Sequence, residues 1–447
     1  MAGDRIQYSE SMGDEMNRSK LWEAVCWFFI IGVVILVQSE TFRSMTDTPS
    51  DSTPDIAIHR IGKYYVGVKQ LLANNPGAMQ ITPQLGQTFE RFQRNGTQLS
   101  SIPVLAELSG RDTALKELER MSANPDTIRN AKDLPVFQKL YREGSDALDS
   151  DERLVLERYG WIGELALSQD KPDTNPERQA VLKSAAGMVV KIVLTIMAVI
   201  ACFLGGLVLF IISIVFWFKG RIPTRLVMPE YPARSLLESF TVYLVGSTII
   251  PYLILTVAPG FGIGAMIIQI LFILFPIPWL FIRGASWKGC REALGWHIGQ
   301  GPLREIGAGI LGCITGLPLV FCAFVVVTIM VQRTGIIPYH PVVEHIGSSP
   351  IRVLFLACVF APVVEETLFR GALFGYLRRS FSWVISGIIS GLIFAAIHPQ
   401  GWVAVPLLCT IGFIFAAIRE WRGSIIASMT AHSMINGIAV LMTLAGM

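Results

Sequence analysis

The residues of this chain that could carry out chemistry stand inside apolar sequence near its end. Glu365, Glu366 and Arg370 lie in an apolar run at 353–377, which is long enough to cross a bilayer. Each charge at the centre of a membrane helix costs roughly 2.5–3.5 kcal/mol, so such charges must be paired or face a wet cavity. Glu366 and Arg370 are four residues apart and can pair on one helix face. Glu365 points about 100° away and has no local partner. A buried ion pair that only fixes helix packing is the structural alternative.

Two more apolar runs carry polar residues. His398 ends the run at 382–398, and His432 and Asn436, again four residues apart, lie within the run at 424–444. A single intramembrane histidine is often a packing residue, but polar groups on three separate helices favour a site. Glutamate and histidine commonly move protons to and from water and a leaving amine, and asparagine can donate to a developing oxyanion. Glu365, His398 and His432 are also a His₂Glu ligand set of the kind that binds zinc.

Residues 350–440 resemble the CAAX prenyl endopeptidase and bacteriocin-processing (CPBP, Abi) family of intramembrane proteases. The resemblance rests on three ordered motifs, each with all its positions filled: Glu365-Glu366-x-x-x-Arg370, Phe394-x-x-x-His398 and His432-x-x-x-Asn436.

The resemblance implies a role for each motif residue. Glu365 would activate water and His398 would assist it, while His432 and Asn436 would stabilise the oxyanion. Glu366 and Arg370 would support the site. The family has been described both as metalloproteases and as metal-independent glutamate proteases, so the cofactor remains open, with zinc as the candidate. If a metal is bound, Glu365, His398 and His432 would hold it.

Composition indicates a membrane protein. Of the 447 residues 52% are hydrophobic and 16% charged, against roughly 25% charged in ordinary soluble domains. The net charge of +3 does not indicate nucleic-acid binding. Seven cysteines, six of them in apolar runs, show neither a disulfide framework nor a paired-cysteine metal site. Nine apolar runs are long enough to be membrane spans: 21–37, 188–218, 237–258, 262–282, 306–331, 353–377, 382–398, 402–418 and 424–444.

This order predicts an all-α polytopic membrane protein with about nine transmembrane helices and a small, mostly helical extracytoplasmic domain. The predicted parts are a cytoplasmic N-terminus (1–20), a first transmembrane helix (21–38), the extracytoplasmic domain (39–186), transmembrane helices 2–5 with their loops (187–345), and a protease-like core of transmembrane helices 6–9 (346–447). The first helix is expected to be retained, because no small-residue cleavage pattern follows it.

Basic residues in alternate short loops predict the orientation. The basic loops carry Lys219, Arg221, Arg225 and Arg234, then Arg283, Lys288, Arg291 and Arg304, then Arg378 and Arg379, and finally Arg419 and Arg422. The loops between them are nearly uncharged, with Arg333 and Arg352 as exceptions. This pattern places the N-terminus in the cytoplasm, as expected for a bacterial inner (plasma) membrane protein.

The function expected from the resemblance is hydrolysis of a peptide bond in a membrane-associated or lipidated protein or peptide. The partners would be that substrate and the lipid bilayer, with no nucleic acid. Two alternatives stay open. A proton-coupled transporter also needs intramembrane carboxylates and histidines, but it predicts inverted repeats, which the sequence does not show by inspection. A non-catalytic family member would bind a membrane partner without cutting it.

The predicted orientation can be tested with reporter fusions. A reporter fused within residues 60–170 is expected to be exported, and one fused after Arg225 is expected to stay in the cytoplasm. The measurement is reporter activity on each side of the membrane. Finding both reporters on the same side would contradict the nine-span topology.

Overall fold

The computed structural model describes residues 20–41, 53–73, 78–92, 98–123, 132–226, 233–336, 338 and 349–444, and every regular element among them is a helix. The all-α class predicted from the sequence is confirmed. Apart from Lys20, the N-terminal segment expected at 1–20 lies outside the described residues. The chain divides into two compact units: unit 1 contains residues 1–48 and 200–447, and unit 2 contains residues 49–199.

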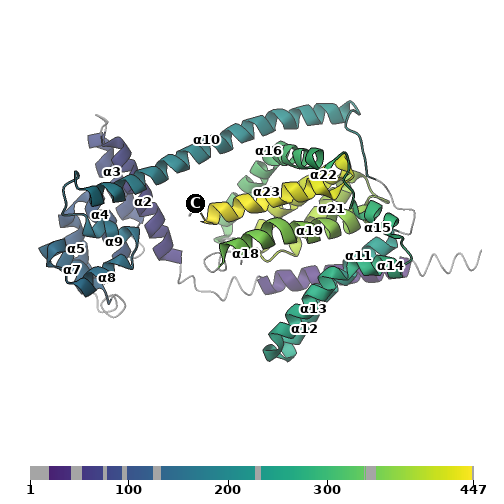
Figure 1. Cartoon of the computed structure of the whole chain (residues 1–447), viewed down its shortest axis with the longest axis horizontal. Helices are drawn as coiled ribbons and strands as arrows, with labels where there is room; N and C mark the ends of the chain where they lie inside the picture. The colour runs from purple at the N-terminus through teal and green to yellow at the C-terminus, as the bar shows by residue number, and fades with distance from the viewer. Residues whose placement is uncertain are drawn as a thin grey trace, which may run out of the picture. The chain divides into compact units, whose positions relative to one another are not determined.

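Unit 2 consists of short helices packed around one apolar core (Figure 1). Its helices are α2 (Thr53–Leu72), α3 (Ala78–Phe92), α4 (Ile102–Ser109), α5 (Arg111–Ser122), α7 (Leu134–Glu143), α8 (Ser150–Glu157), α9 (Trp161–Leu167) and the first turns of α10 (Pro176–Phe218). Helix α4 is central, because all its residues from Ile102 to Leu108 are buried and it packs against α2, α3, α5 and α9.

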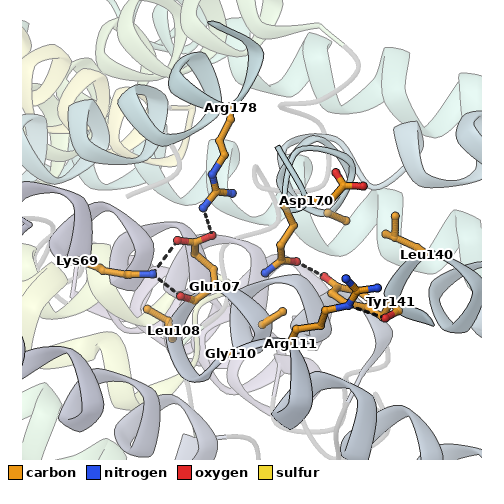
Figure 2. Close-up of a pocket in the computed structure, with 12 residues that line it drawn as sticks. Lys69, Glu107, Leu108, Gly110, Arg111, Leu140, Tyr141, Asp170 and Arg178 are labelled. Atoms are coloured by element: carbon orange, nitrogen blue, oxygen red, sulfur yellow. Dashed lines mark hydrogen bonds and ion pairs between the residues drawn. The ribbon is translucent and has the colours of Figure 1, made fainter. Parts of the chain in front are cut away.

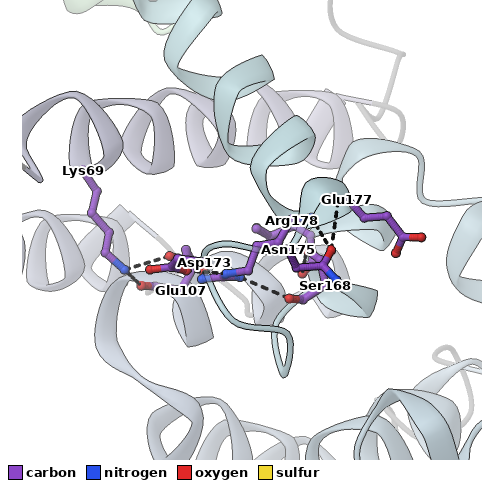
Figure 3. A network of polar contacts seen from close by, with 8 residues as sticks. Lys69, Glu107, Ser168, Asp173, Asn175, Glu177 and Arg178 are labelled. Atoms are coloured by element: carbon purple, nitrogen blue, oxygen red, sulfur yellow. Dashed lines mark hydrogen bonds and ion pairs between the residues drawn. The ribbon is translucent and has the colours of Figure 1, made fainter.

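Helix α4 also carries a carboxylate, that of Glu107, into this core. Lys69 of α2 donates to its Oε1 at 2.8 Å, and Arg178 of α10 donates to its Oε2 at 2.9 Å (Figure 3). Arg178 also donates from Nε to Asp173 at 2.6 Å. Because a buried carboxylate without partners is costly, this network ties α2, α4 and the start of α10 together.

A pocket of about 410 Å³ opens beside this network (Figure 2). Its polar walls are bonded within unit 2: Tyr141 donates to Gln169 at 2.6 Å, and Asp170 accepts from the backbone N–H of Ser145 at 2.6 Å. Arg111 donates from Nε to the Tyr141 carbonyl at 2.7 Å. These bonds link α5, α7 and the segment after α9 around the pocket.

Six helices in the described part are long and apolar enough to cross a membrane: Lys20–Thr41, Pro176–Phe218, Arg234–Val257, Pro302–Thr334, Trp402–Arg422 and Ile425–Met442. The pair Gly262–Leu274 and Pro276–Ile282, bent by 51°, makes a seventh if it is one span. The protein is therefore an integral membrane protein, as the composition predicted.

The predicted count of nine spans is not confirmed. The run at 353–377 is helical throughout, but it contains three charged residues. The run at 382–398 forms a helix of only 14 residues, Trp383–Ala396. At 1.5 Å per residue that helix is about 21 Å long, against a hydrocarbon core of about 30 Å.

Unit 1 is a helical bundle in which α16, α21, α22 and α23 pack against one another (Figure 1). Its first helix is Lys20–Thr41, and it also contains the part of α10 from Ile200 to Phe218. Its other helices are α11 (Arg234–Leu244), the π-helix η4 (Val245–Ile249), α12 (Ile250–Val257), α13 (Gly262–Leu274), α14 (Pro276–Ile282), α15 (Trp287–Leu294), α16 (Pro302–Thr334), α21 (Trp383–Ala396), α22 (Val405–Arg422) and α23 (Ile425–Leu444), together with the helix from Pro350 to Leu377 described below. Glycines allow the closest approaches. A Cβ on Gly391 of α21 would lie 2.7 Å from the Cys409 carbonyl of α22, as is usual where membrane helices pack on small residues.

The Glu107 network predicts how unit 2 responds to mutation. Arg178→Ala should destabilise it by roughly 3 kcal/mol, at the low end for a broken buried ion pair because Lys69 still faces Glu107. Hydrogen exchange of the α4 amides in the full chain measures the loss. Arg142→Ala is the control, because its 3.4 Å ion pair with Glu119 is exposed and should contribute less than about 1 kcal/mol. If the α4 amides were equally protected from hydrogen exchange in both variants, the role given to Arg178 would be contradicted.

Candidate active site

One continuous helix, Pro350–Leu377, carries both candidate carboxylates and changes its winding around them. It runs through α18 (Pro350–Phe355), the π-helix η6 (Leu356–Phe360), α19 (Ala361–Glu365), the π-helix η7 (Glu366–Leu373) and α20 (Phe374–Leu377). Glu365 is the last residue of α19 and Glu366 the first of η7. Such π-turns are rare and frequently occur at functional sites.

Glu366 and Arg370 form the ion pair that their spacing predicted. Both side chains are fully buried, and Nη1 of Arg370 lies 2.9 Å from Oε1 of Glu366. Arg370 also donates from Nη2 to the Gly412 carbonyl of α22 at 3.1 Å. Its guanidinium lies 4.7 Å from the centre of the Phe394 ring and 5.0 Å from that of Phe415. The pair is thus anchored to α22 and enclosed by aromatic faces, which favour a cation.

The imidazole of His432, on α23, approaches both carboxylates, one with each ring nitrogen. Nδ1 lies 2.9 Å from Oε1 of Glu366, and Nε2 lies 3.7 Å from Oε2 of Glu365. The ring stacks on Phe415 with 4.9 Å between centroids. Because the Glu366 carboxylate can only accept, we assign a proton to Nδ1. In the neutral ring, Nε2 is then an acceptor that faces Glu365.

His398, two residues beyond the end of α21, completes the group. Its Nδ1 is hydrogen bonded to the Phe394 carbonyl, and its Nε2 lies 3.9 Å from Oε2 of Glu365. The carbonyl accepts from Nδ1–H, so this Nε2 is also an acceptor in the neutral ring. The structure therefore brings Glu365, His398 and His432 together. The Glu365 side chain is 23% exposed, whereas that of Glu366 is fully buried.

The donor types at this point are those of a zinc site, but their spacing is wider. Each histidine gives its other ring nitrogen to an oxygen, as metal-binding histidines do. Ligand atoms about 2.0–2.1 Å from a tetrahedral zinc ion lie roughly 3.3 Å apart. The separations from Glu365 to the two histidines are 3.7 and 3.9 Å. Among the described residues, no group of three or more His, Cys, Asp or Glu side chains is arranged to hold a metal ion.

Asn436 contacts a different part of the same helix. It donates from Nδ2 to the carbonyl of Ala357, in η6, at 2.8 Å. That carbonyl lies about two turns before Glu365. The amide has a second N–H, which this hydrogen bond does not use. The role of Asn436 as an oxyanion donor stays a prediction.

One residue at this site was not predicted from the sequence. Ser433, next to His432, donates its hydroxyl to the Cys358 carbonyl at 2.6 Å. The only signal in the sequence was its position three residues before Asn436, which puts both on neighbouring parts of one helix face.

The assignment of Arg419 and Arg422 to a basic loop is wrong. Both belong to the last turn of α22. Arg419 is fully buried and donates to the carbonyls of Arg370 at 3.4 Å and Ala293 at 3.1 Å. Arg422 is paired with the buried Glu305 at 2.7 Å. Internal partners compensate these charges, so the two arginines are weak markers of orientation.

Comparison with known proteins agrees with the three motifs. Residues 347–438 match the family described as "Type II CAAX prenyl endopeptidase Rce1-like". The family predicted from the motifs, one of membrane proteases, is confirmed for this region. No solved structure matches the chain.

The relatives that match are bacterial. The chain is 28% identical over 103 residues to "Putative membrane peptidase YdiL" of Bacillus subtilis, covering 23% of this chain and 41% of that protein. It is 29% identical over 101 residues to "Membrane-embedded CAAX protease MroQ" of Staphylococcus aureus, covering 21% of this chain and 40% of the relative. The chain thus spans about two fifths of the length of these relatives.

The buried pair predicts the effect of removing its cation. Arg370→Ala should destabilise the protein by roughly 3–5 kcal/mol, because Glu366 keeps its charge in a buried setting without the guanidinium. Thermal unfolding in detergent measures this. Lys288→Ala is the control, since its 3.9 Å pair with Glu292 is exposed. If both variants unfold at the wild-type temperature, the pair does not support the fold.

Proposed function

We propose that this protein is an intramembrane endopeptidase that hydrolyses a peptide bond of a membrane-associated or lipidated protein or peptide. The observation that carries the proposal is the convergence of His398 and His432, from two further parts of the chain, on one carboxylate oxygen of Glu365. Peptide hydrolysis needs a base and a second proton-handling group within reach of one water molecule, and this arrangement offers both.

We assign the base to Glu365. Its carboxylate takes a proton from a water molecule as the water oxygen adds to the peptide carbonyl carbon. His398, whose Nε2 faces the same oxygen, orients that water. When the tetrahedral intermediate collapses, the C–N bond breaks and the proton on Glu365 passes to the leaving nitrogen.

His432 and Asn436 are proposed to stabilise the oxyanion. With a proton on Nε2 as well, His432 can donate to the oxyanion, while Nδ1–H stays bonded to Glu366. Glu366 would then act as a buried carboxylate does beside a catalytic histidine, fixing the ring and stabilising the imidazolium. The second N–H of Asn436 is the other proposed donor. If a metal is needed, Glu365, His398 and His432 would hold it, and it would polarise the scissile carbonyl as a Lewis acid.

The proposal places the protein in a bacterial plasma membrane with the N-terminus in the cytoplasm and residues 39–186 outside. The bacterial relatives support the membrane type. The basic residues at 219–225, at 283–291 (which include the start of helix α15) and at 378–379 support the orientation, without the two arginines of α22.

The test compares newly formed protein N-termini in native membranes that contain either the wild-type chain or a variant. Glu365→Ala, His398→Ala and His432→Ala should each abolish the wild-type cleavages while the protein still accumulates. Asn436→Ala should slow them by about 10²–10³-fold if it is one oxyanion donor. Combining Glu365→Ala with His398→Ala should add little further loss, because parts of one catalytic unit are not additive.

Glu292→Ala, which removes a surface carboxylate of α15, is the matched control and should cleave normally. A chelator separates the two chemistries. Loss of cleavage activity that added zinc restores indicates a metal-dependent reaction, and cleavage that the chelator does not change indicates glutamate acting directly. Prenylated and unprenylated forms of the identified substrate show whether the lipid is recognised. Wild-type cleavage by well-folded Glu365→Ala protein would remove the catalytic assignment, and a transporter or non-catalytic role would then take its place.

A further inference from the structure

Pro362 removes a backbone donor from the helix just before Glu365. In η6 the N–H of Ala361 donates to the Leu356 carbonyl, five residues back, as in a π-turn. The Ala357 carbonyl would next be served by residue 361 in α-winding or by residue 362 in π-winding. The first of these donors is already used, and the second does not exist because proline has no N–H. The Cys358 carbonyl likewise lacks its α-type donor, which would be residue 362.

Helix α23 supplies donors to these two carbonyls. Asn436 donates to the Ala357 carbonyl at 2.8 Å, and Ser433 donates to the Cys358 carbonyl at 2.6 Å. Membrane helices tolerate proline where side chains of neighbouring helices satisfy the backbone groups that it frees. Here the side chains belong to the helix that also carries His432.

We propose that Ser433 is a positioning residue, which together with Asn436 holds η6 in π-winding and thereby sets the direction of Glu365. The inference rests on the proposed function. On the other side of Glu365, His432 is bonded to Glu366 at 2.9 Å. Helix α23 is therefore bonded both to the backbone of η6, before Glu365, and to the side chain of Glu366, directly after it.

The winding of η6 determines where the Glu365 carboxylate lies. Each residue of a helix turns the side-chain direction by about 100°. If η6 changed from π-turns to α-turns, the residues after it would rotate about the helix axis, and the Glu365 carboxylate would turn away from both histidines. Ser433 and Asn436 donate to the two carbonyls, those of Cys358 and Ala357, that lack an α-type donor in this winding. A return to regular α-winding would move the Ala361 N–H from the Leu356 carbonyl to the Ala357 carbonyl and turn both carbonyls relative to α23, so the hydrogen bonds from Ser433 and Asn436 favour the π-winding.

The first test measures cleavage kinetics on a substrate found by the comparison of newly formed protein N-termini. Ser433→Ala should lower kcat by roughly 10–100-fold and leave KM within about twofold, as expected when a reacting group is misplaced without loss of binding. Ser433→Thr keeps the hydroxyl and should restore most of kcat. Thr430→Val is the matched control on α23, because the Thr430 hydroxyl donates to the Ile426 carbonyl of its own helix and to no other helix among the described residues. Three results would overturn the proposal: a rise in KM with kcat unchanged, no recovery of kcat in Ser433→Thr, or an equal fall of kcat in Thr430→Val.

A second measurement does not depend on cleavage. Hydrogen exchange of the backbone amides at 356–366, on the full chain in detergent, should be faster in Ser433→Ala than in wild type, Ser433→Thr or Thr430→Val. Unchanged exchange in Ser433→Ala would overturn the inference even if the protein is a protease. Faster exchange in Ser433→Ala, in a protein whose wild type cleaves nothing, would support the positioning role of Ser433 and overturn the proposed function instead.

Discussion

The geometry of the site depends on one buried carboxylate, that of Glu366. A single oxygen, Oε1, lies 2.9 Å from the Arg370 guanidinium and 2.9 Å from Nδ1 of His432. A buried carboxylate that loses its partners is strongly destabilising, so neither partner is free to move away. Arg370 reaches α22 through the Gly412 carbonyl, and His432 belongs to α23. One charge therefore joins three helices and orients the imidazole.

That orientation gives two adjacent carboxylates different environments. His432 turns one nitrogen to Glu366 and the other to Glu365, so the ring links the structural pair to the more exposed carboxylate. Glu366 has a permanent cation beside it and can stay ionised at membrane depth. Glu365 faces two imidazole nitrogens instead, which can gain or lose a proton. This difference is the reason for assigning the proposed proton transfer to Glu365, although the two residues are neighbours in the chain.

The sequence predicted the elements of this site better than their fine geometry. Four-residue spacing was enough for the Glu366–Arg370 pair, because side chains at that distance share a helix face. The π-winding was not predictable, since it depends on the interplay of Pro362 with donors from a helix about 70 residues later. Arg419 was misassigned for a similar reason: its acceptors come from Arg370 and Ala293, and only tertiary packing buries it. The prediction of nine spans used only the length and the polarity of each apolar run. These two properties do not show that a run forms a short helix, as at 383–396, or two helices with a bend between them, as at 262–282.

A purely structural interpretation explains Glu366 and Arg370 but not Glu365. The paired residues are fully buried, and Oε1 of Glu366 lies 2.9 Å from both Arg370 and His432, although Oε2 of Glu366 and Nε of Arg370 have no hydrogen-bond partner among the described residues. Oε2 of Glu365 is buried, yet no side chain or backbone donor of the described residues is hydrogen bonded to it. An unpartnered acceptor facing two further acceptors is unfavourable unless a proton, a water molecule or a cation lies between them. Packing gains nothing from such an arrangement, since an apolar residue at 365 would remove the cost. The proposed reaction, which needs a base beside two proton-handling groups, gives such an arrangement a use.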